Sequence, residues 1–492
     1  MRTPVEQRRG PSAVVHRLRR ATPAWAVVLA ACAGQFLVVL DVSVVNVALP
    51  SMRAGLGLSV TGLQWVVNAY SIAFAGFMLL GGRAGDLFGH KRMFLAGLGL
   101  FTLASLAGGL AQAEWQLLAG RAVQGLGAAV LAPSTLTLLL AAVPEGPARG
   151  RTVATWAAVG AGGGAAGGLV GGVLTDALSW RWVLLINVPV GVLVLTAAAL
   201  CLRESGPRDP RRLDLTGAVL VTGGLAVLAY GIVQTEAAGW TSTRTLVPLL
   251  GGLALLLLFV LVENRAKVPL VPLALFRPRS VWSANTGMFV SGGAMASMWF
   301  LMTLYVQNVL GYTPLEAGVA LIPSSLAVVL GSKAAPWVMR RLGLRTTVVL
   351  GLVLAAGGFL WQSTMSARGD YVHDVLGPGI LMMLGAGLTT TPLATLATTG
   401  AAPEDAGLVS GLVNTSRTMG AALGLAVLST VAAARTANGT DPQALNSGYA
   451  LAFRVSGCVL VGAVLLLLLT LPRPPRPAPV AEAAVASPAP GD

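Results

Sequence analysis

Charged residues are scarce in this sequence. Only 11% of its 492 residues are charged, whereas an ordinary soluble protein has roughly 25%. Hydrophobic residues make up 55%, and the mean hydropathy is +0.76. A single soluble core stops growing near roughly 250–300 residues, so this apolar surplus has no place in one. We therefore expect the chain to fold in lipid.

Cysteine and histidine are also rare, with three of each, and they are widely spaced: Cys32, Cys201, Cys458, His16, His90 and His373. This excludes a disulfide framework and disfavours a metal site. We find no nucleophile–base set and no G-x-x-x-x-G-K-[ST] phosphate loop. The sequence thus predicts no cofactor, no ATP as a partner and no enzyme activity.

Long apolar runs fill most of the chain. About 20 apolar residues cross a hydrocarbon layer of ~30 Å. We expect an all-α membrane protein with fourteen transmembrane helices, at 24–49, 62–82, 93–112, 116–140, 151–174, 181–202, 215–233, 246–262, 281–308, 316–338, 346–365, 372–397, 407–432 and 451–471. We interpret the first as an uncleaved span rather than a signal peptide, because it is long, carries Asp41 and precedes a full helical array.

The basic residues predict an orientation. The formal net charge is +14, and an even number of spans puts both termini on one side. Most lysines and arginines fall on that side, while those expected opposite are Arg53, Arg181, Arg244, Arg368 and Arg435. Basic loops stay in the cytoplasm, which predicts a multi-pass plasma (inner) membrane protein with both termini cytoplasmic. The basic charge then requires no nucleic acid as a partner, only membrane lipid.

Two opposite charges lie inside predicted spans at matching depth. Asp41 precedes Pro50 by nine residues, and Arg121 follows Glu114 by seven. At 1.5 Å rise per residue, both lie roughly 10–14 Å below the outer boundary. Charges in this position are costly and mark functional sites. We expect an ion pair where a proton competes with a substrate; the alternative is that the two charges merely neutralise each other.

Polar and aromatic residues accompany this pair on the first, second and fourth predicted helices. Amides facing lipid would be unsatisfied, so they should face a protein interior or a wet cavity. We take as substrate-cavity candidates Gln35, Asn46, Gln64, Trp65, Asn68, Tyr70 and Gln124. Helix-to-helix hydrogen bonding remains the alternative for the amides, and anchoring at the membrane interface remains the alternative for Trp65.

The fifth predicted helix carries a dense glycine cluster. Small residues spaced by four let helix backbones approach closely, and glycine softens a helix. The pattern involves Gly160, Gly164, Gly167, Gly168, Gly171 and Gly172. It predicts a packing seam, and either a rigid seam or a hinge remains open.

The segment GRAGDLFGHKR joins the second and third predicted helices. A signal for topology alone would need only its cations. The additional acid and glycines suggest a cytoplasmic latch that forms in one state and breaks in another, made of Gly82, Asp86, Gly89, Lys91 and Arg92. Glycine allows the tight turn, and the cations face the anionic leaflet.

Together these motifs resemble the major facilitator superfamily, specifically its fourteen-helix drug:proton antiporter branch. The segment 82–92 resembles its signature loop, LDVSVVNVALP at 40–50 its first-helix motif, and RAVQGLGA at 121–128 its fourth-helix motif. SWRWVLLINVPVG at 179–191 is similar to its junction between helices five and six. The second half matches more weakly, through SGLVNTSRTMGAALG at 410–424.

The resemblance implies two six-helix bundles, 24–202 and 281–471, around a cavity that opens alternately to each side. Two inserted helices with their loops occupy 203–280, between the bundles. The resemblance leaves a cytoplasmic segment, 1–23, before the first bundle and a disordered cytoplasmic tail, 472–492, after the second. It also associates Arg121 with proton coupling. The family's helix-five motif has a proline that this glycine cluster lacks, which weakens the inference of antiport.

The function that we expect is proton-driven export of an amphipathic small molecule, such as an antibiotic or another lipophilic cation. Asp41 would carry or gate the proton, and Arg121 would respond to its charge. A proton-coupled importer of a small metabolite uses the same fold and remains the alternative. A membrane-embedded ligand sensor is disfavoured, because the sequence has no sizeable cytoplasmic output domain.

Overall fold

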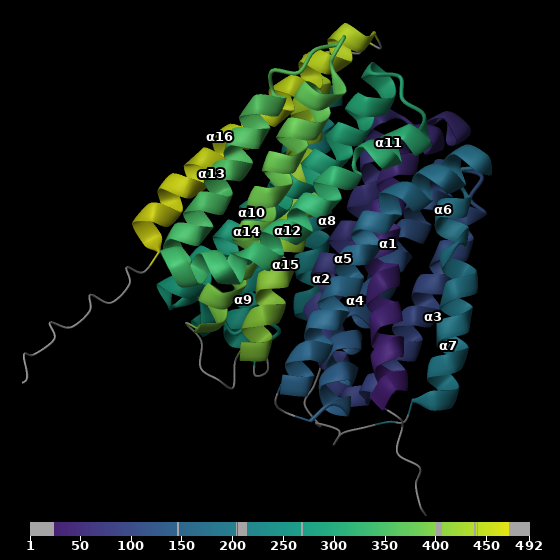
Figure 1. The fold of residues 1–492 in the computed structure, drawn as a ribbon, viewed down its shortest axis with the longest axis vertical. Helices are drawn as coiled ribbons and strands as arrows, with labels where there is room; N and C mark the ends of the chain where they lie inside the picture. The colour runs from purple at the N-terminus through teal and green to yellow at the C-terminus, as the bar shows by residue number, and fades with distance from the viewer. Residues whose placement is uncertain are drawn as a thin grey trace, which may run out of the picture.

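The computed structural model describes residues 24–144, 147–202, 204, 214–266, 269–399, 406–436, 439 and 441–471. Every regular element in these ranges is a helix (Figure 1). Fourteen spans within this described part of the chain are long and apolar enough to cross a membrane, as the sequence predicted. We name the two sides of the molecule by the ends of the first helix, the Ala24 side and the Leu56 side.

Ten of the spans are single helices: α1 (Ala24–Leu56), α2 (Val60–Phe88), α3 (His90–Gly109), α4 (Glu114–Ala142), α5 (Pro147–Ala177), α8 (Leu215–Ala238), α9 (Thr243–Arg265), α13 (Leu344–Gln362), α15 (Ala406–Thr436) and α16 (Pro442–Thr470). The others combine two elements: α6 (Trp182–Leu185) with α7 (Asn187–Cys201), α10 (Arg279–Leu304) with η2 (Tyr305–Val309), α11 (Pro314–Ala320) with α12 (Ile322–Leu342), and η3 (Val372–Leu376) with α14 (Gly377–Thr399). A short 3₁₀ helix, η1 (Leu273–Phe276), precedes α10.

The end of α1 differs from the sequence prediction. We expected the helix to stop before Pro50, because proline lacks the N–H that continues the hydrogen-bond ladder. The helix instead runs through Pro50 to Leu56. Met52, in this added stretch, is completely buried, so packing of the last turns outweighs the lost hydrogen bond.

The helices form two sets that lie side by side (Figure 1). In the first set, α1 packs on α5, and α4 packs on both α2 and α3. In the second set, α10 packs on α15, and α14 packs on both α12 and α13. The two sets touch through α2 with α15 and through α5 with α11.

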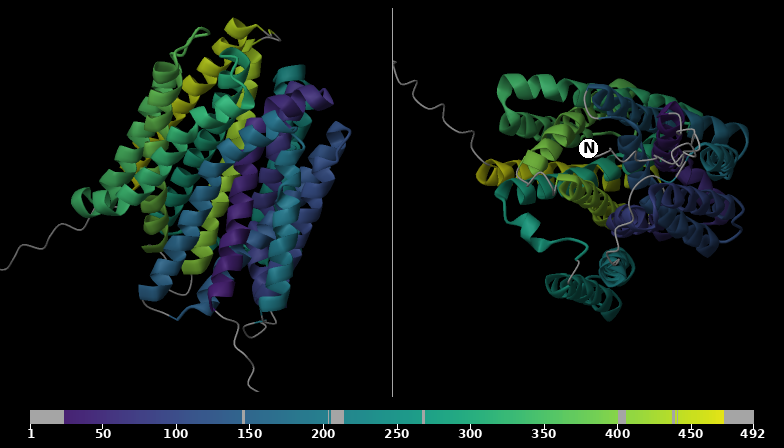
Figure 2. Two further views of the ribbon diagram at one scale, coloured as in Figure 1. Left: turned by 45° about the vertical axis from the view of Figure 1, so that its right-hand side comes forward. Right: turned by 90° about the horizontal axis from the view of Figure 1, so that it is seen from below.

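Helices α8 and α9 stand apart as a pair, which is clearest in the right panel of Figure 2. They pack on each other, and α8 also contacts α2 and α15. A cluster that includes Ile72, Val221, Leu225 and Ala426 forms this contact. Since α2 belongs to the first set and α15 to the second, α8 lies against the place where the two sets meet.

The glycines of α5 face two different helices. Gly160, Gly164, Gly167 and Gly171 lie against α1, where Ser43 Oγ donates to the carbonyl of Gly164 at 2.8 Å. Gly168 and Gly172 lie instead against α11, near the backbones of Gly318 and Pro314. A side chain at most of these positions would meet backbone or side-chain atoms at close range. Helix α5 thus packs closely on α1 within the first set and on α11 of the second set.

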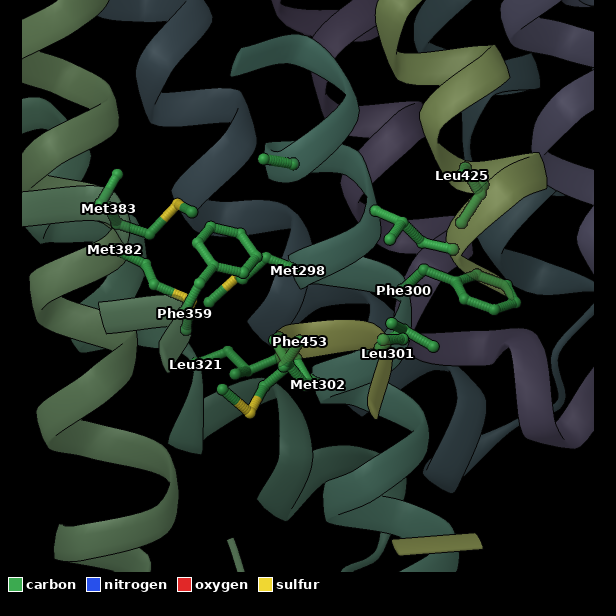
Figure 3. Close-up of a cluster of buried hydrophobic side chains, with 14 of the residues drawn as sticks. Met298, Phe300, Leu301, Met302, Leu321, Phe359, Met382, Met383, Leu425 and Phe453 are labelled. Atoms are coloured by element: carbon green, nitrogen blue, oxygen red, sulfur yellow. The ribbon is translucent and has the colours of Figure 1, made fainter. Parts of the chain in front are cut away.

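A methionine-rich cluster fills the second set (Figure 3). Its core includes Met298, Met302, Met382 and Met383, beside the rings of Phe359 and Phe453, which lie 5.9 Å apart. Methionine is flexible and fills irregular gaps between helices. Phe300 and Leu301 extend the cluster toward α1 and α2.

Candidate functional site

Asp41 lies in the middle of α1 and is fully buried, with an exposed fraction of 0%. Its Oδ2 accepts a hydrogen bond from Arg121 Nη1 at 2.7 Å. Its Oδ1 accepts from Gln124 Nε2 at 2.7 Å and from Asn187 Nδ2 at 2.8 Å. A buried carboxylate is tolerated only when it is paired and hydrogen-bonded in this way.

Arg121 is held from several directions and is 2% exposed. Its Nε donates to the carbonyl of Val66 at 3.0 Å, and its Nη1 also donates to Gln124 Oε1 at 2.7 Å. The guanidinium lies over the ring of Tyr70, 4.4 Å from the centroid. The cation therefore keeps favourable contacts that do not depend on Asp41.

Ser105 of α3 completes the arrangement by accepting from Gln124 Nε2 at 2.6 Å and from Asn187 Nδ2 at 3.3 Å. We call the connected residues the Asp41 network: Asp41, Tyr70, Ser105, Arg121, Gln124 and Asn187. They come from α1, α2, α3, α4 and α7. A change in the charge of Asp41 would thus be felt by five helices of the first set.

The structure brings Asp41 and Arg121 together, as their matching depths suggested. Their role in proton coupling stays a prediction. Ser105 and Asn187 were missed by the sequence analysis. Asn187 is polar within an otherwise apolar span, Trp182–Cys201, and this could have pointed to it. Ser105 offered no comparable signal, since serine is common in such helices.

The seven cavity candidates do not share one surface. Gln124 and Tyr70 belong to the Asp41 network. Trp65 packs against the cluster that joins α2 to α8 and α15, so it lies inside a helix contact. Gln35 is partly buried beside Gly160 of α5, and Asn46 is also partly buried.

Gln64 and Asn68 are fully buried on α2. Among the described residues, Gln64 Oε1 and both polar atoms of the Asn68 side chain have no hydrogen-bond partner. Unsatisfied buried polar atoms are costly. These two amides are therefore the candidates that most need a ligand, water or another conformation.

A cleft of about 720 Å³ opens beside Gln64 on the Leu56 side. It lies between α1 and α2 of the first set and α10, α15 and α16 of the second. Phe300 and Leu301, at the edge of the cluster in Figure 3, form part of its wall. Its size is that of a pocket for a small organic molecule.

The predicted latch segment is a tight turn between α2 and α3. Gly89 has φ +100°, which side chains other than glycine rarely adopt. Lys91 Nζ donates to the carbonyls of Ala199 at 2.9 Å and Leu202 at 2.6 Å, at the end of α7. Gly82 lies near Pro133 of α4, and the side chain of Asp86 lies outside the described residues.

Glu204 is a partner of this turn that the sequence analysis missed. Its carboxylate accepts from the backbone N–H groups of Lys91 at 3.1 Å and Arg92 at 3.3 Å, and it lies 4.0 Å from Arg92 Nε. An anion at the start of α3 and a cation at the end of α7 both suit the helix dipoles. These contacts lie within the first set, so the opening and closing of a latch stays a prediction.

In the part of the chain that the structure describes, no three or more His, Cys, Asp or Glu residues form a group that could hold a metal ion.

Comparison with known families and proteins gives a consistent result. The family described as Major Facilitator Superfamily matches residues 31–425. The chain is 46% identical to the cephamycin export protein of Amycolatopsis lactamdurans, over 90% of this chain and 92% of that protein. It is 37% identical to the puromycin resistance protein of Streptomyces alboniger, over 88% of each.

Solved structures agree on the fold. A nucleoside transporter superposes with a TM-score of 0.67 at 11% identity, covering 91% of this chain and 100% of that one. An auto-inhibited peptide transporter superposes with a TM-score of 0.68 at 16% identity, covering 92% and 99%. Identities this low show a shared fold and nothing about the cargo.

Proposed function

The chain belongs to the major facilitator superfamily, and on this basis we propose that it is a secondary active transporter that exports small amphipathic molecules in exchange for protons. Members of this family are transporters rather than enzymes. Relatives that cover most of this chain include a cephamycin export protein and a puromycin resistance protein. Their names support export rather than import.

The Asp41 network is the observation that carries proton coupling. When Asp41 is ionised, the charge of Arg121 is compensated and both amide donors have an acceptor. A proton on Asp41 removes that compensation and leaves a buried cation with only neutral partners. The two charge states of Asp41 thus favour different arrangements of α1 against α4 and α7. A cargo that binds one arrangement better exchanges with the proton.

Alternating access follows from the two helix sets. We propose that 24–202 and 281–471 move as units, that 203–280 is an insertion between them, and that α5 slides on α11 at the glycine contact. The Ala24 side is the cytoplasmic side in this proposal, because the basic loops lie there. Breaking and remaking the contacts of Lys91 and Glu204 would accompany opening of that side.

Proton flux driven by compounds tests this function. Inside-out vesicles that contain the protein are acidified internally, and cefoxitin or puromycin is added outside. We expect each exported compound to collapse the pH gradient. Asp41→Asn, which is close in shape but cannot ionise, should abolish the collapse. Asp176→Asn makes the same change at an exposed position at the end of α5 and should leave it intact.

Two results would contradict the proposal. A gradient that persists with every compound, in vesicles where the protein is folded, would exclude antiport. Compound-driven proton flux that survives in Asp41→Asn would remove Asp41 from the proton pathway while leaving transport itself in place.

A further inference from the structure

We propose that the cleft on the Leu56 side binds the acidic group of an amphipathic organic anion, a carboxylate above all, with Arg53 as its charge partner. This inference rests on the proposed export function and names the class of cargo. It departs from the lipophilic cation that the sequence led us to consider. Three features carry it: the residues that line the cleft, the lack of a carboxylate partner for Arg53 among the described residues, and the similar lack at Arg417.

Arg53 is the charged residue in the cleft lining, which includes no Asp or Glu among the described residues. The side chain is partly buried near the end of α1. No carboxylate in the described part of the chain lies within ion-pair distance of its guanidinium. A guanidinium presents paired donors that match a carboxylate. An anion would therefore gain a partner here, and a cation would be repelled.

The polar residues of the lining suit the same ligand. Tyr449 of α16 and Asn308 of η2 line the cleft together with Arg53. Gln64 Oε1 is buried at the cleft without a partner. A side-chain amide can present either its N–H or its oxygen to a ligand. Hydroxyl and amide groups of this kind fix the orientation of a polar head group.

The remaining wall suits an apolar body. Phe300, Leu301 and Leu304 of α10 and Leu445 of α16 line the cleft. Phe300 and Leu301 are held by the buried cluster behind them (Figure 3), so this wall is preformed. A cleft with one cation, a few polar groups and a rigid apolar wall fits an amphipathic molecule with a single negative charge.

A second cation with no carboxylate partner in the described part of the chain lies on α15, nearer the Ala24 side. Arg417 of α15 donates from Nε and Nη2 to Asn414 Oδ1, at 3.3 and 2.8 Å. No carboxylate among the described residues lies within ion-pair distance of it. Asn414 also contacts Met78 of α2, so the pair lies where the two sets meet. Arg417 precedes Ser429, a lining residue, by twelve positions, or about 18 Å of helix.

Asp41, the buried acid of the Asp41 network, is not available to bind a cationic cargo. Its carboxylate already accepts hydrogen bonds from Arg121, Gln124 and Asn187. A cargo that moves from the Ala24 side to the Leu56 side would meet Arg417 first and Arg53 last. An unpaired cation in a span is costly, and an anionic cargo supplies the missing charge to each in turn.

The alternative is that Arg53 only stabilises the end of α1, since a cation in the last turn suits the helix dipole. Arg435 makes a matched control. It occupies the last turn of α15 on the same side of the molecule, is exposed and does not line the cleft. Removing the charge of Arg435 leaves the cleft lining unchanged. It also removes one positive charge from the Leu56 side, as removing the charge of Arg53 does.

Charge preference is the measurement that separates these possibilities. The full-length protein is reconstituted in phosphatidylcholine, and binding of radiolabelled cefoxitin, an amphipathic carboxylate, is measured by scintillation proximity. Its uncharged methyl ester and cationic puromycin serve as competitors. We expect cefoxitin to bind better than its ester. Arg53→Gln should weaken cefoxitin about tenfold, as expected for one lost charge-assisted contact, and leave the ester nearly unchanged.

Two control variants should keep the preference for cefoxitin over its ester. Arg435→Gln should keep it fully, and Arg53→Lys, which retains a positive charge, should keep part of it. An equal loss for cefoxitin and its ester in Arg53→Gln would make Arg53 a structural residue and overturn the proposal. So would displacement of cefoxitin by phosphatidylglycerol added to the bilayer, because the occupant would then be a lipid. Stronger binding of puromycin than of cefoxitin would overturn it as well.

Proton flux in the same proteoliposomes separates this inference from the proposed function. If cefoxitin and puromycin both drive proton exchange and Arg53→Gln changes neither, export stands and the anion site fails. If the Arg53-dependent preference is found but no compound moves protons, the site stands and antiport fails.

Discussion

Asn187 shows how a single neutral residue can support a buried charge. It donates to Asp41 Oδ1 at 2.8 Å, and its own Oδ1 has no partner among the described residues. This bond joins α7 to α1 at the carboxylate. In the proposed cycle, Asn187 would hold the Asp41 carboxylate in place while Arg121 provides most of the pairing.

Asn187→Leu should therefore weaken proton coupling. With one of its three donors removed, the Asp41 carboxylate is held less firmly, so compound-driven proton flux should fall at equal amounts of folded protein. The lost hydrogen bond should also cost about 1.5–3 kcal/mol in stability, the usual range for a charged partner. Flux is measured in proteoliposomes, and stability by thermal unfolding.

Asn285→Leu is the control for that substitution. Asn285 is also buried, but its partners are Val281 and Ser416 in the second set. It should lose stability without a loss of flux at equal amounts of folded protein. Undiminished flux in Asn187→Leu would mean that its bond to Asp41 is structural only.

The sequence predicted individual site residues unevenly. Asp41 and Arg121 could be found because a charge inside an apolar run is costly and therefore conspicuous. Asn187 was visible but had no apparent partner, since its distance from Asp41 depends on how α7 lies against α1. Glu204 could not be singled out, because acids in loops are ordinary until a helix start is placed beside them.

At the scale of elements, α5 packs on α1 of the first set and on α11 of the second. Its glycines at every fourth position predicted close packing, and the structure shows which helix each glycine contacts. A helix has 3.6 residues per turn, so positions four apart drift slowly around its axis. Gly160 and Gly164 therefore lie against α1, whereas Gly168 and Gly172, further along the same ladder, lie against α11. The sequence could not say that one neighbour is α1 and the other α11, because that depends on how the two sets meet.

Gly168→Val tests the contact between α5 and α11. The new side chain would press on the backbone of Gly318, and overpacking of this kind costs about 1–3 kcal/mol. The arrangement in which the two helices touch should become less populated, and export should slow. A cysteine introduced at Gln307, which donates to the carbonyl of Val47 across the two sets, should then react faster with a membrane-impermeant maleimide in a background without native cysteines.

Gly162→Val provides the comparison for this test. It lies on the same helix, but a side chain there meets no atom within 4 Å. Labelling at position 307 and the export rate should both stay close to those of the parent protein. If Gly168→Val behaves in the same way, the contact between α5 and α11 does not change during transport.

At the scale of the whole molecule, composition and charge predicted the most. Apolar runs need no knowledge of packing to be recognised as spans, so the fourteen helices were found with errors only at their ends. The largest errors are at the start of α16, expected at 451 and observed at Pro442, and at the end of α1, where burial of Met52 overrode the local effect of Pro50. The cleft was beyond prediction, because its lining comes from five helices of both sets.

Orientation is a prediction of the same scale. Cysteines are introduced singly, in a background without native cysteines, at Gln112 between α3 and α4 and at Leu342 at the end of α12. Both positions are exposed. If the Ala24 side is cytoplasmic, an impermeant maleimide should label Gln112→Cys in intact cells, and Leu342→Cys only after the membrane is opened. The reverse pattern would invert the protein and turn the proposed export into import.

Helix α8 contacts α2 of the first set and α15 of the second, while its partner α9 is the least buried of the spans, with 11% of its most apolar window buried. In the proposed cycle, any rotation of one set against the other must slide a helix past α8. The pair would therefore resist this rotation, with the exposed apolar side chains of α9 on its outer surface. In a bilayer, lateral pressure on α9 would press α8 against the contact that each turnover has to break.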